Sequence, residues 1–354
     1  MSWEDKVRKV EPYVPGEQPN VKDMIKLNTN ENPYPPSPKV NECIMSLDYD
    51  RMRLYPNADV MPLRKALAAY HGIDVEQIFV GVGSDDVIDM AFLTFFNSEV
   101  PVLFPDVTYS FYKVWAELYR IPYILKPLDK DMHIDPADYS GENGGVIFPN
   151  PNAPTGVLES RETVEKIIAA NPDSVVMVDE AYVDFAGKDA SVLPLIDKYD
   201  NLLVVRTFSK SRAMAGARIG YCMGSKKLIS SLEAVKFSIN SYTMNTPAID
   251  MGVASVSDDA YFKETIEKIV NTRERLKEEL KKLGFSMPDG KGNFVFAKHE
   301  SAPAKEIYLA LRARNIFVRF FDTPGINDRL RITVGTDEEV DKLIAALKDI
   351  LEGV

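Results

Sequence analysis

Arg206-Thr-Phe-Ser-Lys210-Ser-Arg-Ala-Met-Ala-Gly-Ala-Arg218-Ile-Gly220 follows the apolar run 202–205 and is the most informative stretch of the sequence. The apolar run predicts a buried strand, and a lysine just beyond its carboxyl end would lie where α/β sheets bind ligands. Arg218 offers a rigid fork of N–H donors that suits a phosphate, and Gly220 permits close backbone approach. A lone lysine in a loop would be an ordinary surface residue, but the whole string favours a ligand site.

Strands and helices alternate on either side of this stretch. Apolar runs predict buried strands at 78–83, 100–105, 144–149, 174–179 and 201–209. The segments between them predict helices at 61–72, 84–96, 108–120 and 160–171. This alternation is typical of an α/β fold with a mostly parallel sheet covered by helices.

The composition changes after about residue 247. A long charged helix is expected at 257–283, followed by short strands at 292–298, 316–321 and 329–335 and helices at 303–314 and 337–352. This pattern is typical of a smaller α+β domain. The first residues are rich in proline and asparagine and predict an extended arm. We expect an arm at 1–35 that packs with the small domain and a partner subunit, a large domain at 36–250 and a small C-terminal domain at 251–354.

The net charge and the cysteine content limit the partners and the cellular compartment that we expect. The 354-residue chain has a formal net charge of −11, which disfavours nucleic acid and anionic membranes as partners. Cys43 and Cys222 form no CxxC pair and predict no disulfide framework, and the first residues contain no apolar signal segment. We expect a cytoplasmic protein with no nucleic-acid or membrane partner. Its three scattered histidines also predict no dedicated metal site.

Two further motifs follow predicted strands. Asp179 and Tyr182 come after the apolar run 175–178, and a carboxylate buried there needs a cation, such as a protonated ring nitrogen. The loop Asn150-Pro-Asn-Ala-Pro-Thr-Gly156 follows the strand at 144–149 and could hold an amide in a fixed position. A helix N-cap and a plain turn are the simpler interpretations of these two motifs.

A glycine turn and two arginines complete the candidates. Gly81-Val-Gly83-Ser84-Asp85 joins a strand to a helix, where free N–H groups suit a phosphate, but it lacks the spacing of a dinucleotide fingerprint. Tyr109 could stack on a ring or be an ordinary core residue. Arg331 could bind a carboxylate through two N–H groups, with Arg319 as a second cation nearby, or both could be charges of an edge strand.

In this order the motifs resemble those of the fold-type I, pyridoxal 5′-phosphate-dependent aminotransferases of class I and II, over nearly the whole chain. Closer detail is similar to the histidinol-phosphate aminotransferases, on the segments Leu27-Asn-Thr-Asn30-Glu31-Asn32-Pro33, Arg53-Leu-Tyr55-Pro56, Thr207-Phe-Ser-Lys210 and Leu330-Arg331-Ile-Thr-Val-Gly335-Thr336. The resemblance implies a seven-stranded sheet and a homodimer with a shared active site. It also implies amino transfer from L-histidinol phosphate to 2-oxoglutarate, which gives imidazole acetol phosphate and L-glutamate in histidine biosynthesis.

The resemblance also implies a role for each motif. Lys210 would hold the cofactor covalently and move the substrate proton, Asp179 would pair with its ring nitrogen, and Tyr182 would bind its ring oxygen. Further cofactor contacts would come from Tyr109 on the ring, from Tyr55 across the dimer interface, and around the phosphate from Gly83, Ser84, Asp85, Thr207, Ser209 and Arg218. The substrate would be bound by Arg331 at the carboxylate of glutamate, by Arg319 and Tyr13 at the phosphate of histidinol phosphate, and by Asn30 and Tyr242 along the pocket.

The chain departs from the family pattern at one position. Ala153 stands directly before Pro-Thr-Gly, where the family usually has asparagine. We expect Asn152 to take over the contact with the ring oxygen.

Three other activities share parts of this pattern. A lyase similar to threonine-phosphate decarboxylase would release CO2, and an aromatic amino-acid aminotransferase would accept phenylalanine as the donor. A nicotinamide-dependent or other nucleotide-binding protein that uses the glycine turn would show no yellow, hydroxylamine-sensitive absorbance.

Overall fold

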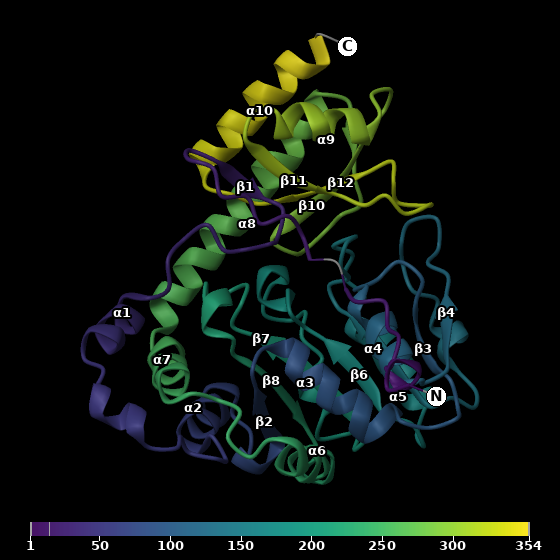
Figure 1. Cartoon of the computed structure of the whole chain (residues 1–354). Coiled ribbons are helices and arrows are strands. Elements are labelled where there is room, and N and C mark those ends of the chain that lie inside the picture. The colour runs from purple at the N-terminus through teal and green to yellow at the C-terminus, as the bar shows by residue number, and fades with distance from the viewer. Residues whose placement is uncertain (1, 14, 353–354) are drawn as a thin grey trace.

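A seven-stranded sheet organises the larger lobe of the computed structural model, which describes residues 2–13 and 15–352 (Figure 1). The strand order is β2-β8-β7-β6-β5-β3-β4, and only β8 runs antiparallel to its neighbours. The predicted α/β class with a mostly parallel sheet is therefore confirmed. The strands are β2 (Ile78–Gly81), β3 (Val102–Pro105), β4 (Tyr123–Lys126), β5 (Gly145–Pro149), β6 (Val176–Asp179), β7 (Leu202–Thr207) and β8 (Gly220–Gly224).

Both faces of this sheet are buried, and each has its own core. Val176 and Val204 belong to the core on one face, whereas Met177 and Val205 belong to the core on the other. Successive strand residues point to opposite faces, so the apolar runs in the sequence are continuous because both faces are covered. One face packs with α2 (Met61–His71), α5 (Arg161–Ala170) and α7 (Thr246–Val256), and the other with α3 (Ser84–Ala91), α4 (Phe111–Tyr119) and α6 (Lys226–Ile239).

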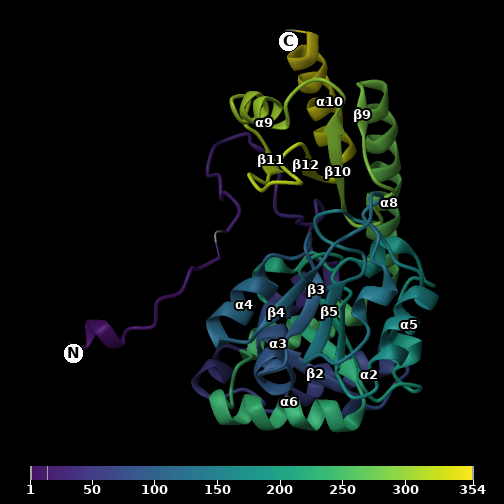
Figure 2. The same cartoon turned by 90° about the vertical axis from the view of Figure 1, so that its right-hand side faces the viewer.

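The smaller lobe is built on a five-stranded sheet of order β1-β11-β12-β10-β9. Its first strand comes from the N-terminal arm and pairs in parallel with β11, while the N-terminal end of the arm stands clear of both lobes (Figure 2). The strands are β1 (Ile25–Leu27), β9 (Phe285–Ser286), β10 (Phe294–His299), β11 (Ile316–Phe320) and β12 (Leu330–Thr333), and the helices are α8 (Asp259–Lys282), α9 (Ala304–Arg312) and α10 (Asp337–Glu352).

The connection between the lobes lies at the junction of α7 and α8. Ile249 and Val256 of α7 belong to the core of the large lobe, and α7 packs on α2 and on α1 (Pro38–Met45). We therefore propose a boundary after residue 256, in place of the one expected at 250. No helix in residues 2–13 and 15–352 is long and apolar enough to cross a bilayer.

The strand directions bring five chain segments to one edge of the large sheet. β2, β3, β5, β6 and β7 run the same way, so their carboxyl ends meet at this edge together with the start of β8. The small lobe covers the edge, since Tyr182 packs edge-on against Phe294 of β10 with ring centres 5.0 Å apart. The predicted motifs after these strands therefore lie at the junction between the lobes.

Candidate active site

Lys210 lies in the loop between β7 and β8, at the edge that the small lobe covers. Its Nζ donates to the carbonyl oxygen of Thr29 at 3.1 Å and lies 5.8 Å from the centre of the Tyr182 ring. The side-chain amide of Asn32 donates to the carbonyl oxygens of Lys210 and Ser211 at 3.1 and 3.2 Å. Residues of the N-terminal arm therefore hold both the backbone and the amine of this lysine.

The loop after Lys210 rests on a buried ionic network. The Ser211 hydroxyl donates to Asp184 at 2.6 Å, and Arg206 joins Asp184 to the buried carboxylate of Glu180. A buried charge needs such partners, because an unpaired one loses its hydration without compensation. The network therefore holds in place the loop that carries Lys210.

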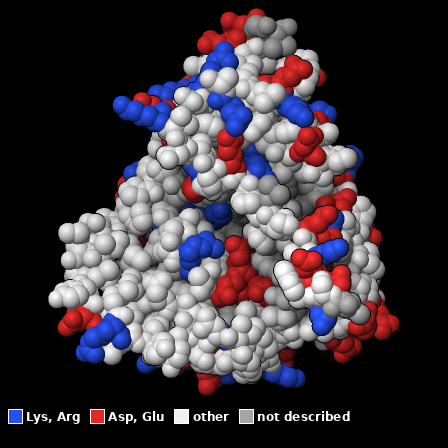
Figure 3. Space-filling view, viewed as in Figure 1, with Lys and Arg blue, Asp and Glu red and all other residues white. Residues whose placement is uncertain are grey.

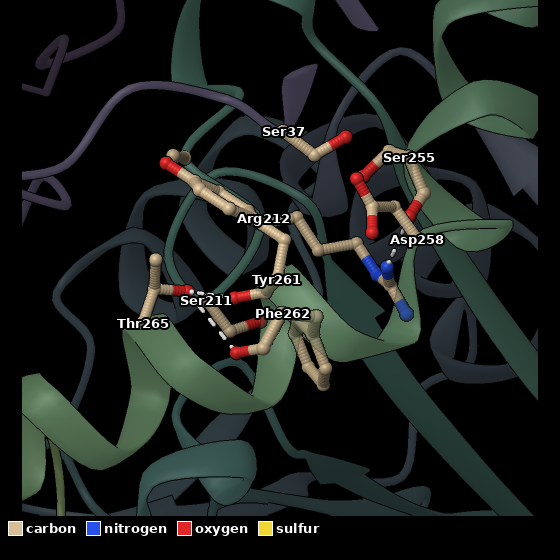
Figure 4. Close-up of a pocket in the computed structure, with 9 residues that line it drawn as sticks. Ser37, Ser211, Arg212, Ser255, Asp258, Tyr261, Phe262 and Thr265 are labelled. Carbon is tan, nitrogen blue, oxygen red and sulfur yellow. Dashed lines mark hydrogen bonds between the residues drawn. The ribbon is translucent and has the colours of Figure 1, made fainter. Parts of the chain in front are cut away.

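Arg212 anchors the same loop from the side. Its guanidinium lies 4.2 Å from the ring centre of Phe262 and 4.9 Å from that of Tyr70, and it donates to the carbonyl oxygen of Ser255. Figure 4 shows the small cavity that Arg212, Ser255 and Phe262 line together with Ser37, Ser211, Asp258, Tyr261 and Thr265. Lys210 is thus presented by a rigid loop.

Asp179 ends β6 and is 5% exposed. Burial raises the pKa of its carboxyl to about 6, although hydrogen bonds from the Tyr112 hydroxyl and the Ala181 amide act in the opposite direction. A carboxyl group of this kind is stabilised as an anion by a cation placed beside it. The site therefore suits a ligand with a basic ring nitrogen.

Tyr182 is buried, and its hydroxyl oxygen accepts a 3.0 Å hydrogen bond from the side-chain amide of Asn30. The amide oxygen of Asn30 accepts from the Thr333 hydroxyl at 3.1 Å. Asn30 therefore lies beside the site, as expected, but both ends of its amide are engaged by protein groups.

Tyr109 is half-buried on the neighbouring loop, and its hydroxyl donates to Asp85 at 2.9 Å. The Asn152 amide donates to the carbonyl oxygen of Val107 at 2.9 Å, in the loop that carries Tyr109. Its Oδ1 is buried and has no hydrogen-bond partner among the described residues. Asn152 therefore keeps one free acceptor next to this loop.

A cradle for an anion forms where α3 begins. A Cβ on Gly220 would lie 2.2 Å from backbone atoms of Gly83 and Ser84, so these segments touch backbone to backbone. Gly83 has φ +90°, and the Arg218 side chain packs directly against it. The N–H groups at the start of a helix and a guanidinium beside them suit a phosphate.

Hydroxyls and one acid complete the cradle. Arg218 donates to Ser209 at 3.4 Å, and the Thr207 hydroxyl accepts from the Ser209 amide at 3.1 Å. Asp85 forms an ion pair with Arg218 at 3.3 Å. The residues predicted to bind a phosphate therefore lie together in one place, and Asp85 of this set is paired with Arg218.

Arg319 and Arg331 are paired across β11 and β12. Neither forms an ion pair with an acid in the described part of the chain. Arg331 donates to the carbonyl oxygen of Asn28, but its buried Nε has no partner there, and burial lowers the pKa of its guanidinium. Two adjacent cations without acids indicate an anionic ligand.

Two predicted residues lie apart from this group of side chains. Tyr55 and Tyr242 stack on each other with ring centres 4.6 Å apart, and they are 81% and 46% exposed. No hydrogen bond or ring contact within the described residues joins either to Lys210. Tyr13 lies nearer, stacked on Phe111 at 4.3 Å.

Three site residues were not predicted. Tyr112 binds Asp179, Asn32 binds the lysine loop, and Thr333 binds Asn30. Asn32 and Thr333 belong to the segments 27–33 and 330–336, whose resemblance assigns no role to either residue. Their partners lie 67, 178 and 303 residues away in sequence, so no local pattern marks them.

The comparisons with known proteins agree with this geometry. The family model for aminotransferases of class I and II matches residues 22–347. A histidinol-phosphate aminotransferase of Lactococcus lactis subsp. cremoris is 49% identical over 99% of this chain and 98% of its own, and histidinol-phosphate aminotransferase 1 of Bordetella parapertussis is 50% identical over 98% of each. The crystal structure of histidinol-phosphate aminotransferase from Sinorhizobium meliloti in complex with pyridoxal-5′-phosphate is 25% identical, with a TM-score of 0.86 over 93% of this chain and 91% of that one.

Proposed function

The chain belongs to the aminotransferases of class I and II, and we propose that it transfers the amino group of L-histidinol phosphate to 2-oxoglutarate. The relatives at 49% and 50% identity support this substrate pair. The observation that carries it is the pair Arg319 and Arg331, two cations without acid partners in the described residues. Both substrates are anions that such a pair can bind.

The site fits pyridoxal 5′-phosphate, the cofactor of this class of enzyme. Lys210 offers an amine for its aldehyde, and Asp179 is a buried acid without an ion-pair partner among the described residues. The cradle of Gly83, Gly220 and Arg218 has the donors for its phosphate. Each functional group of the cofactor would therefore have a suitable residue in this site.

Lys210 and Asp179 are the two residues with direct roles in the reaction. When bound, the cofactor supplies an aldehyde that condenses with amines and a protonated ring that accepts the electron pair left on the substrate carbon. Lys210 provides the first amine and, once the substrate amine replaces it, the base that takes the α-proton. Asp179 would keep the ring nitrogen protonated. The attraction between its carboxylate and this cation offsets the free-energy cost of burying the carboxylate.

The other residues orient the ring. Tyr182 would donate to the ring oxygen of the bound cofactor, and Tyr109, whose hydroxyl is held by Asp85, would cover one face of the ring. We propose that Asn152 also binds the ring oxygen, supported by its place beside the loop that carries Tyr109. Fixed orientation lowers the entropic cost of reaching the transition state.

One pocket has to accept two different anions in turn. Histidinol phosphate carries a phosphate and no α-carboxylate, whereas glutamate carries two carboxylates. We propose that Arg331 binds the α-carboxylate of glutamate and that Arg319 and Tyr13 bind the phosphate of histidinol phosphate. The proximity of the two arginines in adjacent strands supports this division.

We also propose a homodimer with the active site shared across its interface. An apolar surface over α1 and the segment after it includes Met45, Tyr49, Met52 and Tyr55, all more than 60% exposed, and the left part of the face in Figure 3 carries few charges. An apolar patch of this kind marks an interaction surface. A second copy covering it would bring the partner's Tyr55 to the cofactor phosphate.

The free thiols of Cys43 and Cys222 support a cytoplasmic location.

A comparison of amine donors tests the proposed substrate. Purified holoenzyme is given 2-oxoglutarate with histidinol phosphate, phenylalanine or threonine phosphate in separate assays, and both glutamate and CO2 are measured. We expect kcat/KM for histidinol phosphate to exceed that for phenylalanine by at least about 100-fold, because the phosphate–arginine contact contributes about 3 kcal/mol. Equal rates with phenylalanine would reject the substrate assignment, and CO2 release from threonine phosphate would reject the reaction type.

A further inference from the structure

A buried chain of hydrogen bonds leads from the small lobe to Tyr182. The backbone N–H of Asn30 donates to the Thr333 hydroxyl at 3.0 Å, and this hydroxyl donates to Oδ1 of Asn30 at 3.1 Å. The side-chain Nδ2 of Asn30 then donates to the Tyr182 hydroxyl at 3.0 Å. Asn30 and Thr333 are 1% and 2% exposed, so water does not compete for these bonds.

The direction of each bond follows from the first one. A backbone N–H can only donate, so the Thr333 oxygen accepts there and its own proton is available for Oδ1 of Asn30. The amide oxygen is thereby turned to Thr333 and the NH2 group to Tyr182. The Tyr182 oxygen is an acceptor in this bond, and its proton is left to donate to another group.

We propose that Asn30 is a positioning residue that directs the hydroxyl proton of Tyr182 toward the ring oxygen of the cofactor. This inference rests on the proposed function and deepens it. It gives Asn30 a role different from the pocket contact that the resemblance implies. The side-chain amide of Asn30 supports it, because protein groups engage this amide at both ends. The positive φ of Asn30, +55°, is one that asparagine tolerates better than most residues.

The relay also links two parts of the site. Thr333 lies two residues after Arg331 on β12, and both side chains point to the same face of that strand. The strand that carries the substrate-binding arginine therefore also orients the hydroxyl that contacts the cofactor.

Asn30→Asp reverses the polarity of the relay without changing its shape. The new carboxylate accepts from Thr333 and from Tyr182, and two such bonds favour its charged form. The Tyr182 proton then turns away from the ring oxygen. A hydrogen bond to that oxygen stabilises the form in which the lysine-linked nitrogen is unprotonated, so losing the bond raises the pKa of this nitrogen.

The test is a spectrophotometric pH titration of the holoenzymes in the visible range. We expect Asn30→Asp to raise the absorbance midpoint by about one pH unit, in the same direction as Tyr182→Phe, and the double variant to shift no further than Tyr182→Phe alone. Asn293→Ala is the matched control: it lowers the melting temperature but leaves the midpoint in place, because Asn293 contacts only the backbone of Asn30.

If Asn30→Asp does not fold, Thr333→Val removes the group that orients the amide and should raise the midpoint in the same direction. An unchanged midpoint in the folded variant, or shifts that add in the double variant, would overturn the role of Asn30 while leaving the proposed function intact. A wild-type protein with no hydroxylamine-sensitive visible absorbance would overturn both.

Discussion

The hydroxyl of Tyr112 donates a 3.0 Å hydrogen bond to Oδ2 of Asp179, inside the core beneath the active site. Both side chains are almost fully buried, and the bond joins α4 to the end of β6. The bond fixes the orientation of the carboxylate and partly offsets the cost of burying it. No Lys or Arg among the described residues pairs with Asp179, and burial raises the pKa of its carboxyl to about 6.

Asp179→Asn should stabilise the cofactor-free protein above pH 6. The pKa of Asp179 rises from 3.8 in the unfolded chain to about 6 in the folded one, so the folded state holds the proton longer and stability falls as the pH rises from 4 to 6. The penalty above that range is about 3 kcal/mol, and asparagine removes it. Urea unfolding of both apoproteins at pH 4 and pH 8 measures this. Equal stability at pH 8 would show that the burial of Asp179 carries no such penalty.

Tyr112→Phe should move this window upward. The Tyr112 bond lowers the pKa of Asp179 against the effect of burial, so its loss raises that pKa by about one pH unit. The apoprotein should then lose stability over a correspondingly higher pH range. Tyr123→Phe removes a hydroxyl from an exposed hydrogen bond and serves as the control; a Tyr112 variant that behaves like this control would contradict the coupling.

The sequence predicts the positions of Lys210 and Asp179 better than those of their partners. Each follows an apolar run that becomes a strand buried on both faces, so its place at the carboxyl edge follows from local pattern. Tyr112 and Asn32 reach the site from distant segments, and only the tertiary fold determines such contacts.

Strand direction and exposure are also set by the tertiary fold. β8 returns antiparallel because residues 208–219 contain no crossover helix, which the alternating pattern alone does not reveal. The stacking of Tyr55 on Tyr242 at the surface is likewise invisible in the sequence.

Gly220→Ala should weaken cofactor binding. A Cβ there would lie 2.2 Å from the backbone of Gly83 and Ser84, so the start of α3 has to move. We expect a loss of about 3 kcal/mol in stability and a clear rise in the dissociation constant for pyridoxal phosphate. Gly216→Ala is the control, because a Cβ at Gly216 meets nothing within 4 Å. Equal cofactor affinity in the two variants would remove Gly220 from the cradle.

Arg331→Gln should raise KM for 2-oxoglutarate by about 100-fold, because a charge-assisted contact of about 3 kcal/mol is lost. The effect on kcat should be smaller, since binding and not the proton transfer depends on this residue. Arg314→Gln, at an exposed position of the small lobe, provides the control. An unchanged KM for 2-oxoglutarate would mean that another group binds the carboxylate.

Covalent attachment of the cofactor to Lys210 is the most direct test of the whole account. The holoenzyme is reduced with borohydride, digested and mapped by mass spectrometry, with Lys210→Ala treated in parallel. We expect one pyridoxyl-labelled peptide, carrying its label on Lys210 in the loop that follows β7, and no labelled peptide from the variant. A label on any other lysine, or the same labelled yield from Lys210→Ala, would contradict the account.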